Sequence, residues 1–123
     1  MGMPSPQELV ARHGTRRPEG LAAALGFRVT RADRPSPVPG VTVMSAYDPH
    51  DGIILYQAPL RQAAATRQVP LARLEQWHIA HELYHALAEK EGMSPWCVRE
   101  TDADRWADTL LALLGPDGAP ASA

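Results

Sequence analysis

The stretch WHIAHELYHALAEKEG, residues 77–92, contains the pattern H-E-x-x-H. His81 and His85 are four positions apart, so on a helix they lie about one turn apart on the same face. Both imidazole rings can then reach one zinc ion at about 2.0–2.1 Å. Glu82 lies about 100° further round the helix, where it can take a proton from a water that zinc activates. The stretch predicts a helix with two zinc ligands and a catalytic base; a helix with solvent-facing histidines is the alternative.

A catalytic zinc site needs a third protein ligand and an open fourth position. Glu100 begins the run ETDAD, and Asp104 follows it four positions later, so both carboxylates share one helix face. We expect Glu100 to be the third ligand and Asp104 to hydrogen-bond the far nitrogen of a ligand histidine, which orients the ring. Glu91 and Cys97 stay open as alternative ligands. A helix that continues past residue 88 would carry Glu91 away from the metal, and Cys97 suits a small buried apolar role.

Other polar side chains near the pattern are candidates for supporting roles. His78 lies one turn before His81, so it is expected either to contact the ligands or to face water. Tyr84, Tyr56 and Tyr47 are candidate hydrogen-bond donors to a developing oxyanion. The sequence does not choose among these tyrosines.

Patterns elsewhere in the chain predict the rest of the domain. Capped runs favour helices, and alternating β-branched runs favour strands. The expected elements are a helical preamble over 1–26, a sheet over 27–58 with strands at 27–32, 41–47 and 53–58, the active-site helix over 70–91 and a third-ligand helix over 95–114. They predict a single α+β domain over 1–123, a compact minimal zincin. In it, a small sheet packs against the active-site helix and the C-terminal helix that follows.

Capping residues set the expected helix ends. Ser5 is the expected cap of the first helix, and Gly14 its stop. Ser94 is the expected cap of the last helix, with Pro95 in its first turn and Gly115 as its stop.

Composition limits the classes of protein to which the chain can belong. It has 123 residues, 45% of them hydrophobic, which suits one domain with a core. Its net charge of −2 gives no sign of nucleic-acid binding. Cys97 is the only cysteine, so an intrachain disulfide is excluded, and no apolar run approaches the length of a membrane span. We therefore expect a cytoplasmic protein without a membrane or direct nucleic-acid partner; nothing indicates its oligomeric state.

Two motifs resemble the ImmA/IrrE family of zinc metallopeptidases. The run HIAHELYHAL, 78–87, is similar to the family's AHELGH helix, and ETDADRWADTLLALLGP, 100–116, is similar to its ExEAnxFAxxLLmP-like segment. Tyr84 departs from the family's usual glycine. The resemblance covers about residues 40–116 and implies one zinc ion, peptide-bond hydrolysis and, as substrate, a DNA-binding repressor of the helix-turn-helix type.

The residues and the resemblance together predict a zinc-dependent peptidase. Glu82 would take a proton from water and pass it to the leaving amine. One alternative is a non-catalytic, zinc-stabilised module on the same fold that binds a repressor without cutting it. Another is an enzyme whose substrate is not a peptide. The presence of Glu82 favours the peptidase, because a binding module does not need a base.

Overall fold

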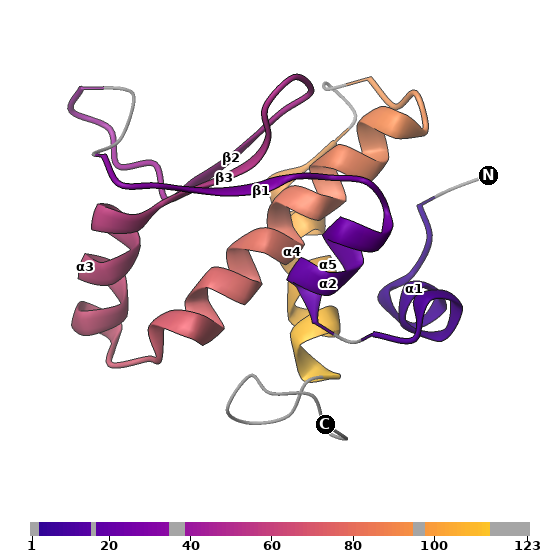
Figure 1. Cartoon of the computed structure of the whole chain (residues 1–123), viewed down its shortest axis with the longest axis horizontal. Coiled ribbons are helices and arrows are strands. Elements are labelled where there is room, and N and C mark those ends of the chain that lie inside the picture. Colours follow the sequence, from indigo (N-terminus) through magenta and orange to yellow (C-terminus); the bar gives the residue numbers. More distant parts are fainter. Residues whose placement is uncertain (1–2, 16, 35–38, 95–97, 114–123) are drawn as a thin grey trace.

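The structure is a computed structural model that describes residues 3–15, 17–34, 39–94 and 98–113. This part of the chain forms an α+β fold, as the sequence predicts (Figure 1). Its elements are α1 (Pro6–His13), α2 (Pro18–Ala24), β1 (Val29–Ala32), β2 (Ser45–Asp48), β3 (Gly52–Tyr56), α3 (Gln57–Arg67), α4 (Leu71–Lys90) and α5 (Glu100–Ala112). None of the described helices has both the length and the apolar character that crossing a membrane requires.

The three strands form one sheet in the order β1-β3-β2. β3 lies in the centre, parallel to β1 and antiparallel to β2, and its residues Ile53 and Leu55 are fully buried. Such burial explains why β3 reads as a continuous apolar run rather than an alternating one. Among the described strands β2 lies at an edge of the sheet, and it packs against α4.

Gly52 starts β3 at a point where only glycine fits. Its φ is 86°, and a Cβ atom there would lie 2.5 Å from the carbonyl oxygen of Arg28. The amide of the next residue, Ile53, donates a hydrogen bond to the same carbonyl at 2.8 Å. The glycine therefore allows the close backbone approach by which β3 begins its pairing beside β1.

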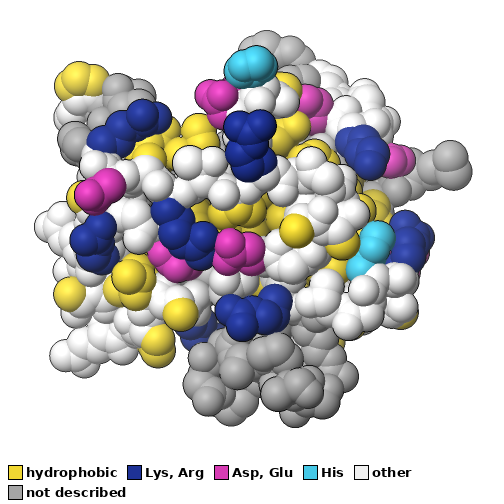
Figure 2. Space-filling view, in the orientation of Figure 1, with side chains coloured by type: hydrophobic (Ala, Val, Ile, Leu, Met, Phe, Trp, Pro, Cys, Tyr) yellow, Lys and Arg dark blue, Asp and Glu magenta, His cyan; other side chains and the backbone are white. Residues whose placement is uncertain are grey.

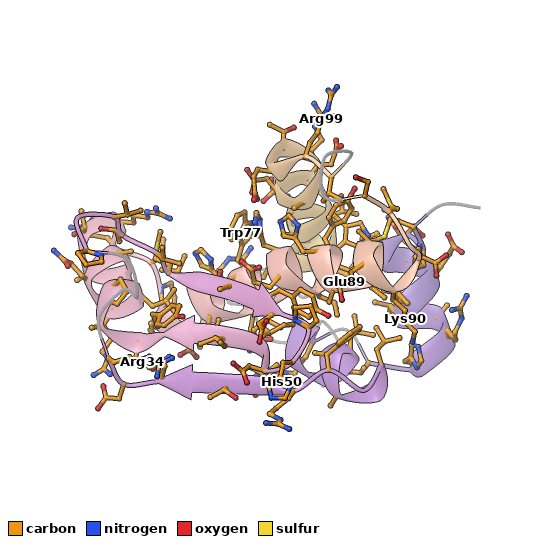
Figure 3. The ribbon with its side chains drawn as sticks, turned by 90° about the horizontal axis from the view of Figure 1, so that it is seen from above. Arg34, His50, Trp77, Glu89, Lys90 and Arg99 are labelled. Carbon is orange, nitrogen blue, oxygen red and sulfur yellow. The ribbon has the colours of Figure 1, made fainter. Side chains whose placement is uncertain are left out.

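The long helix α4 forms the middle layer of the molecule. It packs against β2 and β3 on one side and against α5 on the other, as the two perpendicular views show (Figures 1 and 3). Ile79 and Leu83 are fully buried within it. On α5, Ala103 and Ala107 are fully buried, and their small side chains allow the two helices to approach closely. Because α4 has the sheet on one side and α5 on the other, side chains on its two faces meet different partners.

A polar cluster ties α4 to the sheet and to the N-terminal helices. Arg31 of β1 forms a bidentate pair with Glu19 of α2 at 2.9 and 3.0 Å, and it also contacts Glu75 of α4 at 3.3 Å. Gln57 of α3 donates to the other oxygen of Glu75 at 2.8 Å. In Figure 2, basic side chains lie beside acidic ones across the middle of the face that β1 occupies. These contacts satisfy the buried Glu75 carboxylate and fix α4 against three other elements.

The helix α3 was not predicted from the sequence. The expected strand over 53–58 ends at Tyr56, and Gln57 and Ala58 already belong to α3. Its start has no side-chain cap, and Pro59 lies in the first turn, where proline is tolerated. Buried residues are limited to Leu60 and Ala64, which leaves a narrow apolar stripe. Without a cap or a wide stripe, the sequence signal for this helix is weak.

The last helix begins five residues later than expected. Val98 and Arg99 are not helical, and Arg99 precedes the helix with an extended backbone. Ser94 therefore does not cap α5, whereas Pro95, Cys97 and Gly115 lie outside the described residues. Glu100 is the first residue of α5, not one turn inside it, and acidic side chains are favourable at this position of a helix.

The N-terminal helices agree more closely with expectation. Ser5 and Glu8 form a reciprocal capping box at the start of α1, and Gly14 ends this helix with a φ of 71°.

Two of the strands begin later than predicted: β1 begins at Val29 and β2 at Ser45. Residues 41–44 precede β2 without forming part of the sheet.

Candidate metal centre

Three potential metal ligands meet between α4 and the start of α5. Glu100 Oε2 lies 2.7 Å from His81 Nε2 and 3.2 Å from His85 Nε2. One ligand atom from each residue lies within 4.8 Å of the other two. Figure 3 labels Trp77 and Glu89, which lie on either side of the two histidines along α4, and Arg99, which directly precedes Glu100. Two imidazole nitrogens and a carboxylate oxygen in this arrangement can hold a metal ion.

The approach of Glu100 is electrostatically favourable even without considering an ion. Partial burial opposes ionisation of this carboxyl, but the hydrogen bonds and charges of His85 and His81 outweigh burial and lower its pKa. The carboxylate is thus ready to ligate, and it reaches the histidines from the first turn of α5. Although α5 begins later than expected, its first residue, Glu100, lies beside His81 and His85.

His81 is oriented by contacts on two sides. Its Nδ1 lies 2.9 Å from Asp104 Oδ1, the position that the sequence predicts for this carboxylate. The pair is close but poorly aligned, because Nδ1 makes no hydrogen bond with the usual angles to any described residue. The Trp77 ring stacks on the imidazole, with centroids 5.3 Å apart, while its indole nitrogen donates to Asp108 at 2.8 Å. Together these neighbours restrict the rotation of the ring.

Glu82 faces the sheet side of α4, away from α5. Its side chain is buried, and one carboxylate oxygen accepts a hydrogen bond from Ser45 Oγ at 2.8 Å. Burial raises the pKa of the Glu82 carboxyl, and the Ser45 hydrogen bond and the nearby histidines only partly offset this effect. A buried carboxyl with a raised pKa, next to a group that could hold a metal ion, is a candidate for a functional role.

A cavity of about 500 Å³ lies over Glu82 and two of the candidate ligands, His85 and Glu100. Its walls are residues 45–47 of β2, then Glu82, His85 and Glu89 of α4, and finally Met93, Val98 and Glu100. Strand β2 therefore forms one wall of the cavity that Glu82, His85 and Glu100 also line.

The structure distinguishes among the three tyrosines. Tyr47 lines the cavity, and its hydroxyl donates to Glu89 at 3.4 Å. Tyr84 packs between the rings of His85 and Trp106 and is not part of the cavity lining. Tyr56 ends β3 beneath the guanidinium group of Arg34, 5.8 Å from the ring centre, and is also absent from the lining. Tyr47 is thus the tyrosine closest in position to a substrate-binding role.

Of the two alternative ligands, Glu91 is described by the structure and is not part of the metal group. Glu91 is the C-terminal cap of α4 and lines a separate cavity with Glu8 and Arg12. Cys97 lies outside the described residues. His78, which the sequence left undecided, is buried and contacts Ser45 Oγ through Nδ1 at 2.9 Å.

Ser45 is the site residue that the sequence did not reveal. The only local signal is strand alternation, which places Ser45 and Tyr47 on the same face of β2. That signal does not say which helix residue the serine meets. The contact with Glu82 depends on how β2 packs on α4.

The residues of this centre are those of the two motifs that resemble the ImmA/IrrE family, with β2 added by the fold. That resemblance rests on His81, Glu82, His85 and the segment that begins at Glu100. No protein-family model matches the chain, and neither a curated protein nor a solved structure matches it, so membership of this family stays a prediction.

Proposed function

We propose that this chain is a zinc-dependent metallopeptidase with a compact zincin fold that hydrolyses peptide bonds in a protein substrate. The observation that carries the proposal is the combination of a three-residue metal group with the buried carboxylate of Glu82 at one cavity. A metal site that served stability alone would not need this carboxylate beside it.

The ligand set supports zinc as the ion. Two histidines and one glutamate are a set that catalytic zinc sites use, with the fourth position left for water or substrate. Ligands about 2.0–2.2 Å from a tetrahedral zinc are roughly 3.4 Å apart. The 3.2 Å between Glu100 and His85 is close to this spacing, whereas the 2.7 Å between Glu100 and His81 would have to lengthen to admit the ion. When bound, zinc would lower the pKa of water and polarise the substrate carbonyl.

The side chains around the ion would handle protons and orientation. Glu82 accepts the proton of the attacking water and returns it to the leaving amine. Asp104 holds His81 in the orientation in which Nε2 faces the ion, because its carboxylate lies beside Nδ1. Tyr47 lines the same cavity, and its hydroxyl is a candidate donor to the carbonyl oxygen of the substrate.

The edge strand supports a peptide as substrate. β2 pairs with β3 on one side, and no described strand pairs with its other side. Residues 45–47 of this strand line the cavity. An extended peptide can add to such an edge through main-chain hydrogen bonds, a recurring mode of peptide recognition.

Charge in the cavity supports a basic segment of the substrate. Glu82, Glu89 and Glu100 line it, and no lysine or arginine is among its described lining residues. A helix-turn-helix repressor, which the ImmA/IrrE resemblance implies, carries basic side chains for its contacts with DNA phosphates. A cytoplasmic location belongs to the same proposal, since such a substrate is found there.

The deciding experiment is the Glu82→Gln variant. This change preserves size and removes the proton acceptor, so zinc should bind as in the wild type while turnover falls by about 10²–10⁴-fold. Purified protein with zinc is incubated with a candidate helix-turn-helix repressor, and mass spectrometry identifies fragments.

The outcomes separate the proposal from its alternatives. Cleavage by the wild type and not by Glu82→Gln supports the peptidase. Tight repressor binding by both proteins without fragments favours the zinc-stabilised binding module. Equal fragments from both mean that Glu82 is not the base.

A further inference from the structure

A short chain of hydrogen bonds runs beneath the cavity, outside the metal group. Ser45 Oγ lies between two buried side chains of α4, 2.9 Å from His78 Nδ1 and 2.8 Å from Glu82 Oε2. His78 and Glu82 are four positions apart, so both face β2 from successive turns of the helix. The serine thus connects the edge strand to the carboxylate that the proposed function needs.

The direction of these hydrogen bonds follows from the donors available. Ser45 Oγ donates to Glu82 Oε2, so the single proton of the hydroxyl points to Glu82. The hydroxyl oxygen must then accept from His78, which requires the proton of a neutral imidazole to lie on Nδ1. If the proton lay on Nε2 instead, His78 Nδ1 and Glu82 would compete for the one hydroxyl proton.

The surroundings of His78 agree with this tautomer. Burial, with the charges of His81 and Arg67, lowers the pKa of His78 to about 4, so the ring is neutral near pH 7. Its Nε2 is buried and has no hydrogen-bond partner among the residues that the structure describes. A buried acceptor without a partner is less costly than a buried N–H without one, so the proton belongs on Nδ1.

We propose that Ser45 is a positioning residue, held by His78, that fixes Oε2 of Glu82 and leaves Oε1 to take the proton of the attacking water. The catalytic part of this inference rests on the proposed function. The tautomer of His78 and the direction of the Ser45 hydrogen bond do not. Strand β2, which an extended substrate would contact, would therefore also orient Glu82.

The first test needs neither zinc nor substrate. Nitrogen NMR of metal-free protein with ¹⁵N-labelled histidine distinguishes protonated from bare ring nitrogens. In the wild type near pH 7, His78 should show a protonated Nδ1 and a bare Nε2. In Ser45→Ala, Nδ1 loses its acceptor and the two tautomers should mix. A protonated Nε2 in the wild type, or an unchanged His78 in Ser45→Ala, would overturn the inference.

The second test compares Ser45→Thr with Ser45→Val. Both side chains are β-branched and suit a strand, but only threonine keeps the hydroxyl. At equal bound zinc, Ser45→Val should lose about 10–100-fold in kcat with little change in KM, and Ser45→Thr should retain most of the activity. Equal kcat for the two variants would refute the positioning role. If the wild type itself cleaves no peptide, the proposed function fails, and the NMR experiment still decides the hydrogen-bond chain.

Discussion

Replacement of Glu100 by glutamine tests the metal centre most directly. The change removes the charge of the predicted third ligand and keeps its size. The Glu100 side chain is 72% exposed, so without metal the variant should unfold within about 0.5 kcal/mol of the wild type. Any larger difference that appears only with zinc then reports ligation.

The expected size follows from mass action. Zinc at 100 times its Kd adds about 2.7 kcal/mol to the free energy of unfolding. For a chain of this length, 1 kcal/mol corresponds to roughly 3–5 °C, so zinc should raise the wild-type Tm by about 8–13 °C. If loss of one ligand of three weakens binding about 100-fold, the same zinc concentration adds only about 0.4 kcal/mol, or roughly 1–2 °C.

The assay is thermal unfolding with and without zinc, at a concentration set by titration of the wild type. Glu91→Gln is the matched control, because Glu91 caps α4 and lines a different cavity. This variant should keep the full zinc-dependent rise, and His85→Ala should lose it. A full rise in Glu100→Gln would refute the third-ligand assignment, and loss of the rise in Glu91→Gln would move that role to Glu91.

Three further predictions concern the scaffold, each checked by urea unfolding of metal-free protein. Arg31→Ala leaves the buried carboxylate of Glu75 with one partner fewer and should lower the free energy of unfolding by about 1–3 kcal/mol. Arg61→Ala removes only an exposed pair with Asp33 and should lower it by less than about 1 kcal/mol. Equal losses would contradict the role of the polar cluster around Glu75. The pKa of His78 is about 4 in the folded protein and about 6.5 in the unfolded chain. Between these two pH values the imidazole is protonated in the unfolded chain but not in the folded protein. The free energy of unfolding should therefore fall by about 3 kcal/mol as the pH drops from about 6.5 to 4. His78→Asn should lose most of that dependence, and an unchanged pH profile would contradict it. Gly14→Ala should cost about 1–2 kcal/mol for its left-handed backbone alone, and Gly52→Ala clearly more, because its Cβ would also displace a backbone carbonyl; a smaller loss at Gly52 would contradict the observed close approach.

The local features of this chain follow from its sequence, because their physics is confined to one or two helical turns. The i, i+4 spacing places His81 and His85 on one face of α4 whatever surrounds the helix. The capping box at Ser5 needs only neighbouring residues, and α1 begins there as predicted. The α+β class follows in the same way from runs of capped and β-branched residues.

Features that join distant segments were decided by the tertiary structure. The sequence predicts that Glu100 lies level with the histidines, but it predicts this through a helix that begins at residue 95. In the structure α5 begins at Glu100 itself, and this first residue lies beside His81 and His85. Similarly, strand alternation places Ser45 and Tyr47 on one face, yet only the packing of β2 on α4 places them at the cavity. Helix spacing is fixed by hydrogen bonds within one segment, whereas the choice of partner for a side chain depends on loop geometry and on which buried surfaces fit together. For this reason the pair of candidate ligands, His81 and His85, can be read from the sequence, whereas the serine that contacts Glu82 cannot.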